Sequence, residues 1–340
     1  MIDRILKLIL LISPLAYVTG IALGRFEIIF FHFCVLALFL ASLLDSPKRE
    51  CLLLSKGIVL FLSLCILSTV IHTFQVFSVA TLINLFLFCI ALNIIHRYMS
   101  KPKDYYKYII IAAGINIVVY LAQRYCFNFL PFTSYHLGGL FGSAPRLGNY
   151  LAIITPIIFS CLWFTIPVIA VMAGSLNPIG VFLVMVIKTI KENKEVSKFK
   201  IYFYGLIFIL STVFIYLLHK HIMVSILFRL NSFIIPITTE VFKLPLIGHG
   251  LGAYYVNVGN DPYNSMVSFT YDVGILGLVL IGYGLWKIRK YFDLSIESLS
   301  LIAVIMASMI DYPLEIPKLW PTIAFIIAAF FIKETKEATC

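Results

Sequence analysis

Apolar runs close to the thickness of a lipid bilayer recur along the whole of this chain, and they restrict its fold more than any other feature. Stretches such as 76–95, 201–218 and 264–286 approach the roughly 20 residues that a helix needs to cross a membrane. Hydrophobic residues make up 61% of the chain and charged residues 12%, about half the roughly 25% charge of a soluble domain. The sequence therefore predicts an all-α fold in which residues 1–340 form one polytopic integral membrane domain.

The distribution of Lys and Arg predicts which ends of the helices face the cytoplasm. Although the net charge is +10, the basic residues are spread over many short loops, which disfavours nucleic acid as a partner. Short cytoplasmic loops collect Lys and Arg, and 19 of the 26 basic residues fall in loops that this rule places inside, together with both termini. The seven that do not are Arg25, Arg124, Arg146, Lys220, Arg229, Lys243 and Lys318.

About twelve membrane spans are predicted, some of them short or broken. An odd number of crossings must separate the outer loop that contains Arg146 from the basic inner loop 188–200, and proline and glycine residues interrupt the sequence between them. We expect three shortened segments there; two ordinary helices with a misassigned loop are the alternative. The predicted spans are 5–23, 27–44, 57–74, 76–95, 108–123, 148–161, 163–173, 177–190, 201–218, 264–286, 295–311 and 319–332.

Two larger loops, 124–147 and 219–263, are then predicted on the outer face, and they hold five of the seven exceptional basic residues. A reaction on that face has no ATP, so it needs an energy-rich substrate such as a lipid diphosphate sugar. Catalysis then requires cations for the leaving diphosphate and a base for the attacking hydroxyl. Arg146 and Arg229 are the leading diphosphate ligands, because arginine can bind phosphate oxygens with two hydrogen bonds. For Lys220 and Lys243, contact with lipid headgroups or acids is the simpler explanation.

Short glycine-containing strings mark these loops and their edges. Glycines at 248, 250 and 252 flank His249, but no pattern of strand and helix surrounds them as a nucleotide site would require. His249 is a candidate base or a polar residue at an interface, and Asp261 is a candidate base or a turn former before Pro262. The seven cysteines have no metal-ligand spacing, and we expect them to be packing residues. The strings are Gly139-Leu140-Phe141-Gly142 with Arg146-Leu147-Gly148-Asn149, Pro245 to Gly252, and Asn264 followed nine residues later by Gly274-Ile275-Leu276-Gly277.

From about residue 135 to 285, these strings resemble the superfamily of bacterial inner-membrane O-antigen ligases and polymerases. The spacing of Asn264 and the Gly274-x-x-Gly277 string is the most specific similarity. Two positions depart from the family pattern: Tyr263 stands where the family usually has histidine, and Leu176 where it has arginine. The other similar stretches are Gly139 to Asn149 with Leu151, Ala152 and Pro156, then Ala173-Gly174-Ser175, Arg229, and Pro245 to Gly252.

The resemblance implies an inverting transferase of the inner membrane, without metal or cofactor, whose active site is formed by the periplasmic loops 124–147 and 219–263, the second of them large and partly helical. Its donor would be a glycan on undecaprenyl diphosphate, and its acceptor lipid A–core in a ligase or a growing glycan in a polymerase, with membrane lipids around it. Arginines would hold the diphosphate, and the base would be Asp261 or His249, or be absent, since Tyr263 is better suited to donating a hydrogen bond. The expected substrate-binding residues are Arg124, Lys220, Asn264 and Asp272.

The resemblance also gives roles to residues of the span 264–286. Asp272 is expected to orient Arg229 or Asn264, because acids within a membrane are costly and often functional. Gly274 and Gly277 are expected to allow close helix packing, as small residues do in any membrane bundle.

Two other classes of protein compete with the enzyme. A flippase or transporter would show ionisable residues near the bilayer midplane and an internal repeat, whereas the charged residues here gather at the ends of spans and no repeat is evident. A purely structural membrane protein would not need arginines on the outer face together with a spaced loop signature. We therefore rank both below the transferase.

Overall fold

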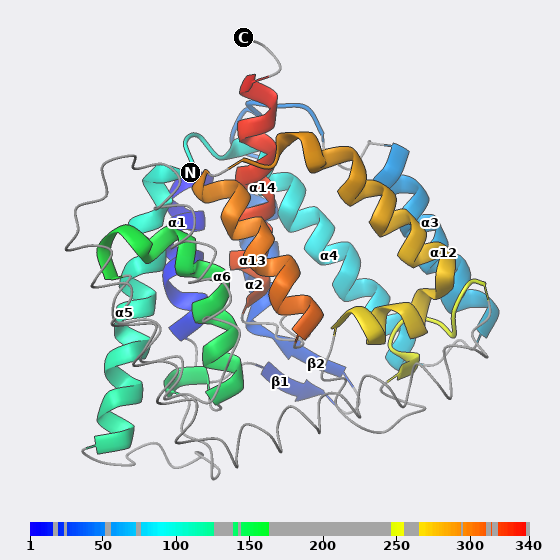
Figure 1. Cartoon of the computed structure of the whole chain (residues 1–340), viewed down its shortest axis with the longest axis horizontal. Coiled ribbons are helices and arrows are strands. Elements are labelled where there is room, and N and C mark those ends of the chain that lie inside the picture. The colour runs from blue at the N-terminus through cyan, green and yellow to red at the C-terminus, as the bar shows by residue number, and fades with distance from the viewer. Residues whose placement is uncertain are drawn as a thin grey trace, which may run out of the picture.

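The structure, a computed structural model, is helical through most of the residues that it describes (Figure 1). These residues are 1–15, 20–23, 26–51, 56–72, 76–125, 139–141, 144–162, 246–254, 265–293, 295–310, 314 and 319–337. The elements are α1 (Ile2–Ile12), η1 (Ser13–Leu15), β1 (Gly20–Leu23), β2 (Phe26–Ile29), α2 (Phe30–Ser42), α3 (Lys56–His72), α4 (Val76–Tyr98), α5 (Lys103–Tyr125), η3 (Gly139–Phe141), α6 (Ala144–Leu162), α12 (Ser265–Ile288), η5 (Arg289–Tyr291), α13 (Ile296–Ile310) and α14 (Trp320–Glu337).

Three of these helical stretches are long and apolar enough to cross a membrane, judged by length and composition. They are Val79–Tyr98, Lys103–Gln123 and Ser265–Tyr291. Shorter apolar helices accompany them in α2, α3, α13 and α14. These findings indicate a membrane protein and confirm a helical bundle for the described part of the chain. Of the twelve predicted spans, 163–173, 177–190 and 201–218 lie outside the described residues.

The predicted spans 5–23 and 27–44 are wrong at the end of the first and the beginning of the second. The first helix ends at Ile12, and Pro14 follows in a 3-10 turn, because proline restricts the residue before it and has no N–H to donate. The chain then forms an antiparallel hairpin in which Gly20 pairs with Ile29 and Leu23 with Phe26. The described elements are otherwise helical, so this hairpin is a local departure from the expected all-α fold; an apolar run by itself does not distinguish a strand from a helix.

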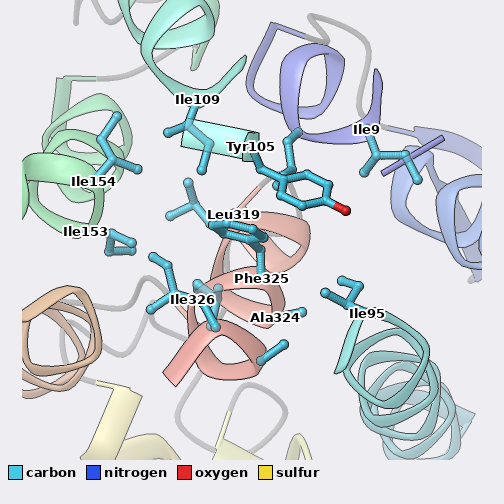
Figure 2. Packing of buried hydrophobic residues seen from close by; sticks show 14 of the residues in the cluster. Ile9, Ile95, Tyr105, Ile109, Ile153, Ile154, Leu319, Ala324, Phe325 and Ile326 are labelled. Carbon is cyan, nitrogen blue, oxygen red and sulfur yellow. The ribbon is translucent and has the colours of Figure 1, made fainter. Parts of the chain in front are cut away.

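Helix α14 lies at the centre of the main hydrophobic core. Phe325 and Ile326 are at most 1% exposed, and Figure 2 shows them surrounded by side chains from other helices, among them Ile95 of α4, Ile109 of α5 and Ile154 of α6. A helix that is apolar on all sides is stable only when neighbours cover it completely. The predicted span 319–332 is therefore confirmed as a buried helix, although its helix continues to Glu337.

Large apolar side chains also cover much of the outside of the bundle. Leu43 and Val118 are 66% and 65% exposed, and similar residues line the outer faces of α3 and α12. Apolar surface of this extent is uncommon on soluble monomers and marks contact with a lipid or a partner. It agrees with the membrane-spanning lengths of α4, α5 and α12.

Several basic loops meet at one end of the bundle, where both termini lie in Figure 1. We call this the basic end and define it by the loops 45–51 and 99–103, residues 287–293 and the last turns of α14. Arg49 donates hydrogen bonds to the carbonyls of His96 at 3.1 Å and Met99 at 2.5 Å, and so binds the C-terminal end of α4. Lys333 of α14 forms an ion pair with Asp293. The predicted inner loops that the structure describes therefore share one end of the molecule, whereas the loop 188–200 lies outside the described residues.

Candidate functional site

Helix α12 is broken at Gly274, and this break organises the site. Gly274 has φ 72° and ψ −171°, a conformation in which α12 cannot continue as one regular helix. A break frees the last carbonyls of the first half and the first N–H groups of the second half. Inside a membrane such groups must find partners in the protein, since the hydrocarbon core offers no water.

Residues 246–254, which we call the glycine turn, supply these partners. The N–H of His249 donates to the carbonyl of Tyr271 at 3.0 Å, and the N–H of Gly250 donates to the carbonyl of Asp272 at 2.9 Å. On the other side of the break, the N–H of Leu276 donates to the carbonyl of Leu246 at 3.2 Å. The glycine turn thus caps both halves of the broken helix.

The glycines of the turn allow backbone to touch backbone. Gly248 has φ 80°, and a Cβ there would lie 2.4 Å from the carbonyl oxygen of Asp272 and 2.4 Å from the N atom of Gly274. A Cβ on Gly274 would lie 2.3 Å from the N atom of Gly248. The two glycines are therefore a matched pair, and neither position accepts a side chain without displacing the other segment.

The buried carboxylate of Asp272 fixes the second part of the turn. Its oxygens accept hydrogen bonds from the N–H groups of Gly252 at 2.7 Å and Tyr254 at 3.0 Å. Backbone N–H groups of one turn that converge in this way form an anion-binding concavity, which here holds a carboxylate from the protein itself. Asp272 therefore positions the turn.

Helix α3 contributes two buried hydroxyls to the same network. Ser68 donates to the carbonyl of Asp272 at 2.8 Å and accepts from the N–H of Gly250 at 3.0 Å. The N–H of Leu251 donates to the hydroxyl of Thr69 at 3.4 Å. Three segments far apart in sequence are therefore joined at one point: α3, the glycine turn and α12.

Aromatic rings hold His249 at the edge of this network. Its imidazole stacks on the ring of Tyr271 with centroids 4.4 Å apart, and Tyr254 meets Tyr271 edge to face at 5.6 Å. Tyr271 and Tyr254 are buried, whereas His249 is half-buried. The imidazole of His249 therefore lies at the boundary of the buried network, within the described part of the structure.

The structure places only some of the predicted site residues. Arg146 is exposed in the first turn of α6, where a loop was predicted, and α13 packs against both α6 and α12 and lies between them in Figure 1. Arg124 belongs to the last turn of α5, again not to a loop, and its side chain lies outside the described residues. The others that lie outside the described residues are Lys220, Arg229, Asp261, Tyr263 and Asn264.

Two expectations about α12 change once the contacts are known. The described partners of the Asp272 carboxylate are backbone amides of the glycine turn, while its predicted partners Arg229 and Asn264 lie outside the described residues. Gly274 does not serve helix packing as expected; it is the site of the break. Gly277 does face α3, and a Cβ on it would lie 3.8 Å from Leu64.

Sequence patterns alone do not indicate that Ser68, Thr69 and Tyr271 belong to the network. Ser68 and Thr69 are adjacent small polar residues within an apolar run, and that pattern occurs in many membrane helices without a polar partner. The expectation that cysteines are packing residues is confirmed for Cys34, Cys65 and Cys89, which are buried and free. In the described part of the chain, no group of His, Cys, Asp and Glu is arranged to hold a metal ion.

Comparison with models of protein families and with curated protein sequences finds no significant match to this chain.

Proposed function

We propose that the protein is a membrane glycosyltransferase that moves a glycan from undecaprenyl diphosphate to an acceptor hydroxyl, with lipid A–core as the acceptor of a ligase. The observation that carries the proposal is the docking of the glycine turn into the break of α12, which holds the His249 imidazole against Tyr271, while Asp272 binds the following residues of the turn. Irregular backbone at membrane depth is tolerated where protein surrounds it or where it lines a polar cavity, and broken helices often mark the binding sites of membrane proteins.

In the proposed reaction, the acceptor oxygen forms a bond to the anomeric carbon of the donor glycan. The bond from that carbon to the diphosphate breaks, and undecaprenyl diphosphate leaves with the bonding electrons. The hydroxyl proton passes to a base, for which His249 is our candidate among the described residues, because a neutral imidazole can accept a proton near neutral pH. Arg146 and Arg229 are proposed to neutralise the diphosphate, with Asp261 as the alternative base and Tyr263 as a hydrogen-bond donor.

The free-energy cost of burying a carboxylate in this network supports the proposal. A carboxylate within a membrane span is expensive to keep and is retained where it has a task. Both carboxylate oxygens of Asp272 accept hydrogen bonds from the turn that carries His249. A site that depends on a fixed catalytic group needs this kind of support. The same arrangement also places the turn away from the basic end, since Gly274 precedes the end of α12 by about 21 Å at ~1.5 Å per residue.

Complementation of a deletion strain tests the proposed diphosphate site. We expect Arg146→Ala and Arg229→Ala to lower glycan attachment, seen as a ladder on a gel, by roughly 100-fold, as for loss of a group that stabilises developing charge. Arg4→Ala is the matched control, because Arg4 is an exposed arginine in α1 at the basic end. Normal ladders from both test variants, at normal protein levels, would rule out the diphosphate site.

The species that accumulates in the deletion strain separates the ligase from the polymerase. Long glycan chains that remain on the lipid carrier indicate a ligase, whereas single repeat units attached to core indicate a polymerase. Both enzymes use the same donor, so the geometry of the glycine turn does not distinguish them.

A transporter or flippase of lipid-linked glycans is the second candidate, and one observation favours it. Secondary transporters place buried ionisable groups at broken helices, as Asp272 is placed here. The two functions differ in the product: a transporter leaves the bond between glycan and diphosphate intact. Release of free undecaprenyl diphosphate by the purified protein, given donor and acceptor, would therefore exclude the transporter.

A further inference from the structure

Three basic residues at the turn after α12 lie in an unusual setting. Lys287, Arg289 and Lys290 are exposed, and in the described part of the chain none lies within ion-pair distance of a carboxylate. The nearby acids in the sequence have other partners: Asp293 pairs with Lys333, and Glu297 accepts a hydrogen bond from Tyr106 at 2.7 Å. This group of cations is therefore available to an anion from outside the described residues.

Exposed aromatic side chains beside these cations indicate the depth at which the cations lie in a membrane. Trp286 and Tyr283 are 55% and 56% exposed, and their rings stack with centroids 6.1 Å apart. The guanidinium of Arg289 lies over the ring of Trp286, 4.9 Å from its centroid. Exposed Trp and Tyr beside Arg and Lys are typical of the interface between hydrocarbon and headgroups.

An exposed apolar stripe continues from this point along α12. Ile275, Val279, Tyr283 and Trp286 follow one another at spacings of three or four residues, so they share one face of the helix, and all are at least 45% exposed. From Ile275 to Trp286 the helix rises about 16 Å at ~1.5 Å per residue, which is close to half of a ~30 Å hydrocarbon core. The stripe therefore has the length of one acyl chain in one leaflet.

We propose that Arg289 and Lys290, together with Trp286 and Tyr283, bind the phosphate headgroup of an anionic phospholipid whose acyl chain lies along this stripe of α12. The charge of the cations, the aromatic pair at headgroup level and the length of the stripe match the three parts of such a lipid. This site is independent of the proposed transferase activity, because it uses none of the residues proposed for glycan transfer, and its cations lie at the end of α12 away from the break at Gly274.

The test uses the intrinsic fluorescence of Trp286 in the purified full-length chain in a neutral detergent. Trp163 and Trp320 are replaced by Phe, and phosphatidylglycerol or phosphatidylcholine with brominated acyl chains is added as a quencher. We expect phosphatidylglycerol to quench at an approximately tenfold lower mole fraction than phosphatidylcholine, since each Lys or Arg adds appreciable attraction to an anionic lipid. High salt should reduce this preference, because it screens exposed charges.

The matched variants separate a site from a general charge effect. Arg289→Ala with Lys290→Ala should abolish the preference, whereas Lys101→Ala with Lys103→Ala, which removes two exposed cations from the same basic end, should preserve it. Equal quenching by the two lipids, or equal loss in both double variants, would overturn the proposal. A concentration-dependent dimer that only the first double variant abolishes would also overturn it, in favour of contact between two copies.

Native mass spectrometry of the unaltered protein provides a second measurement, should the single-tryptophan form fail to fold. Retention of phosphatidylglycerol in preference to phosphatidylcholine, lost in the Arg289→Ala, Lys290→Ala protein, supports the site. Retention of both lipids in equal amounts contradicts it.

Discussion

At the scale of single residues, the contact between Gly248 and Gly274 determines whether the site can form. Both residues have positive φ, and each occupies the space that a Cβ of the other segment would need. Their pairing explains why a glycine-rich string at 245–252 and a glycine string at 274–277 occur together in one sequence. Each string supplies one of the two segments that meet in this backbone contact.

Gly274→Ala should therefore destabilise the protein strongly. The new Cβ would lie 2.3 Å from the N atom of Gly248 and would hold alanine at φ 72°, so we expect a loss of roughly 2–4 kcal/mol. Gly282→Ala is the matched control in the same helix, where nothing lies within 4 Å of the added Cβ and helix propensity improves by up to about 1 kcal/mol. Thermal unfolding in detergent measures both, and equal melting temperatures for the two variants would contradict the backbone contact.

At the scale of elements, the start of α13 is held by a polar cluster around Asp293. The carboxylate accepts hydrogen bonds from the N–H of Ser295 at 3.0 Å and the hydroxyl of Ser298 at 2.7 Å, and it pairs with Lys333. Burial raises the pKa of Asp293, but the hydrogen bonds from Lys333, Ser295 and Ser298 outweigh burial and hold that pKa well below its ordinary value. The cluster links α13 to the last turns of α14.

This lowered pKa makes the link between α13 and α14 sensitive to acid. Because the pKa is lower in the folded state, the cluster stabilises the protein above the unfolded pKa of about 3.9, and this contribution is lost as pH falls towards the folded pKa. We expect Asp293→Asn to lower the melting temperature modestly at pH 6 and to reduce its fall between pH 6 and pH 3. The effect is modest because the side chain is 49% exposed.

Asp104→Asn is the control for this pH series, since Asp104 is an exposed acid at the same end of the bundle. Melting curves at each pH compare the two variants with the unaltered protein. Parallel curves for all three proteins would show that Asp293 does not couple pH to stability.

The sequence predicted elements well where local composition alone determines the structure. It predicted them poorly where contacts between residues far apart in the sequence determine it. The span 319–332 was found as α14, because its proline, Pro321, lies in the first turn, where a helix tolerates it, and the run that follows is continuously apolar. The run 5–23 failed because Pro14 ends its helix, and nothing local shows that the next residues pair as strands. The glycine turn was located, but its docking partners were not, since Ser68 and Gly250 are 182 positions apart.

At the scale of the whole molecule, the contacts organise the bundle around two separate regions. The basic end joins loops through Arg49, Asp293 and Lys333, while the glycine turn joins α3 to the break in α12. Two residues separate helix α6 from the preceding turn η3, which packs against α5 and η1. Figure 1 places the start of α6 towards the end of the bundle away from the termini. The charge bias then predicts that the basic end is cytoplasmic and that Arg146 is reached from the other side.

Cysteine labelling in intact cells tests this topology, including the region beyond α6. In a form whose seven native cysteines are replaced, we expect a membrane-impermeant maleimide to label Arg146→Cys and to leave Lys101→Cys unlabelled until the membrane is opened. Lys194→Cys should behave like Lys101→Cys if the three shortened segments predicted between Arg146 and the loop 188–200 return that loop to the cytoplasm. Labelling of Lys194→Cys from outside would instead favour two ordinary helices, and labelling of Arg146→Cys and Lys101→Cys from the same side would contradict the separation of the two ends.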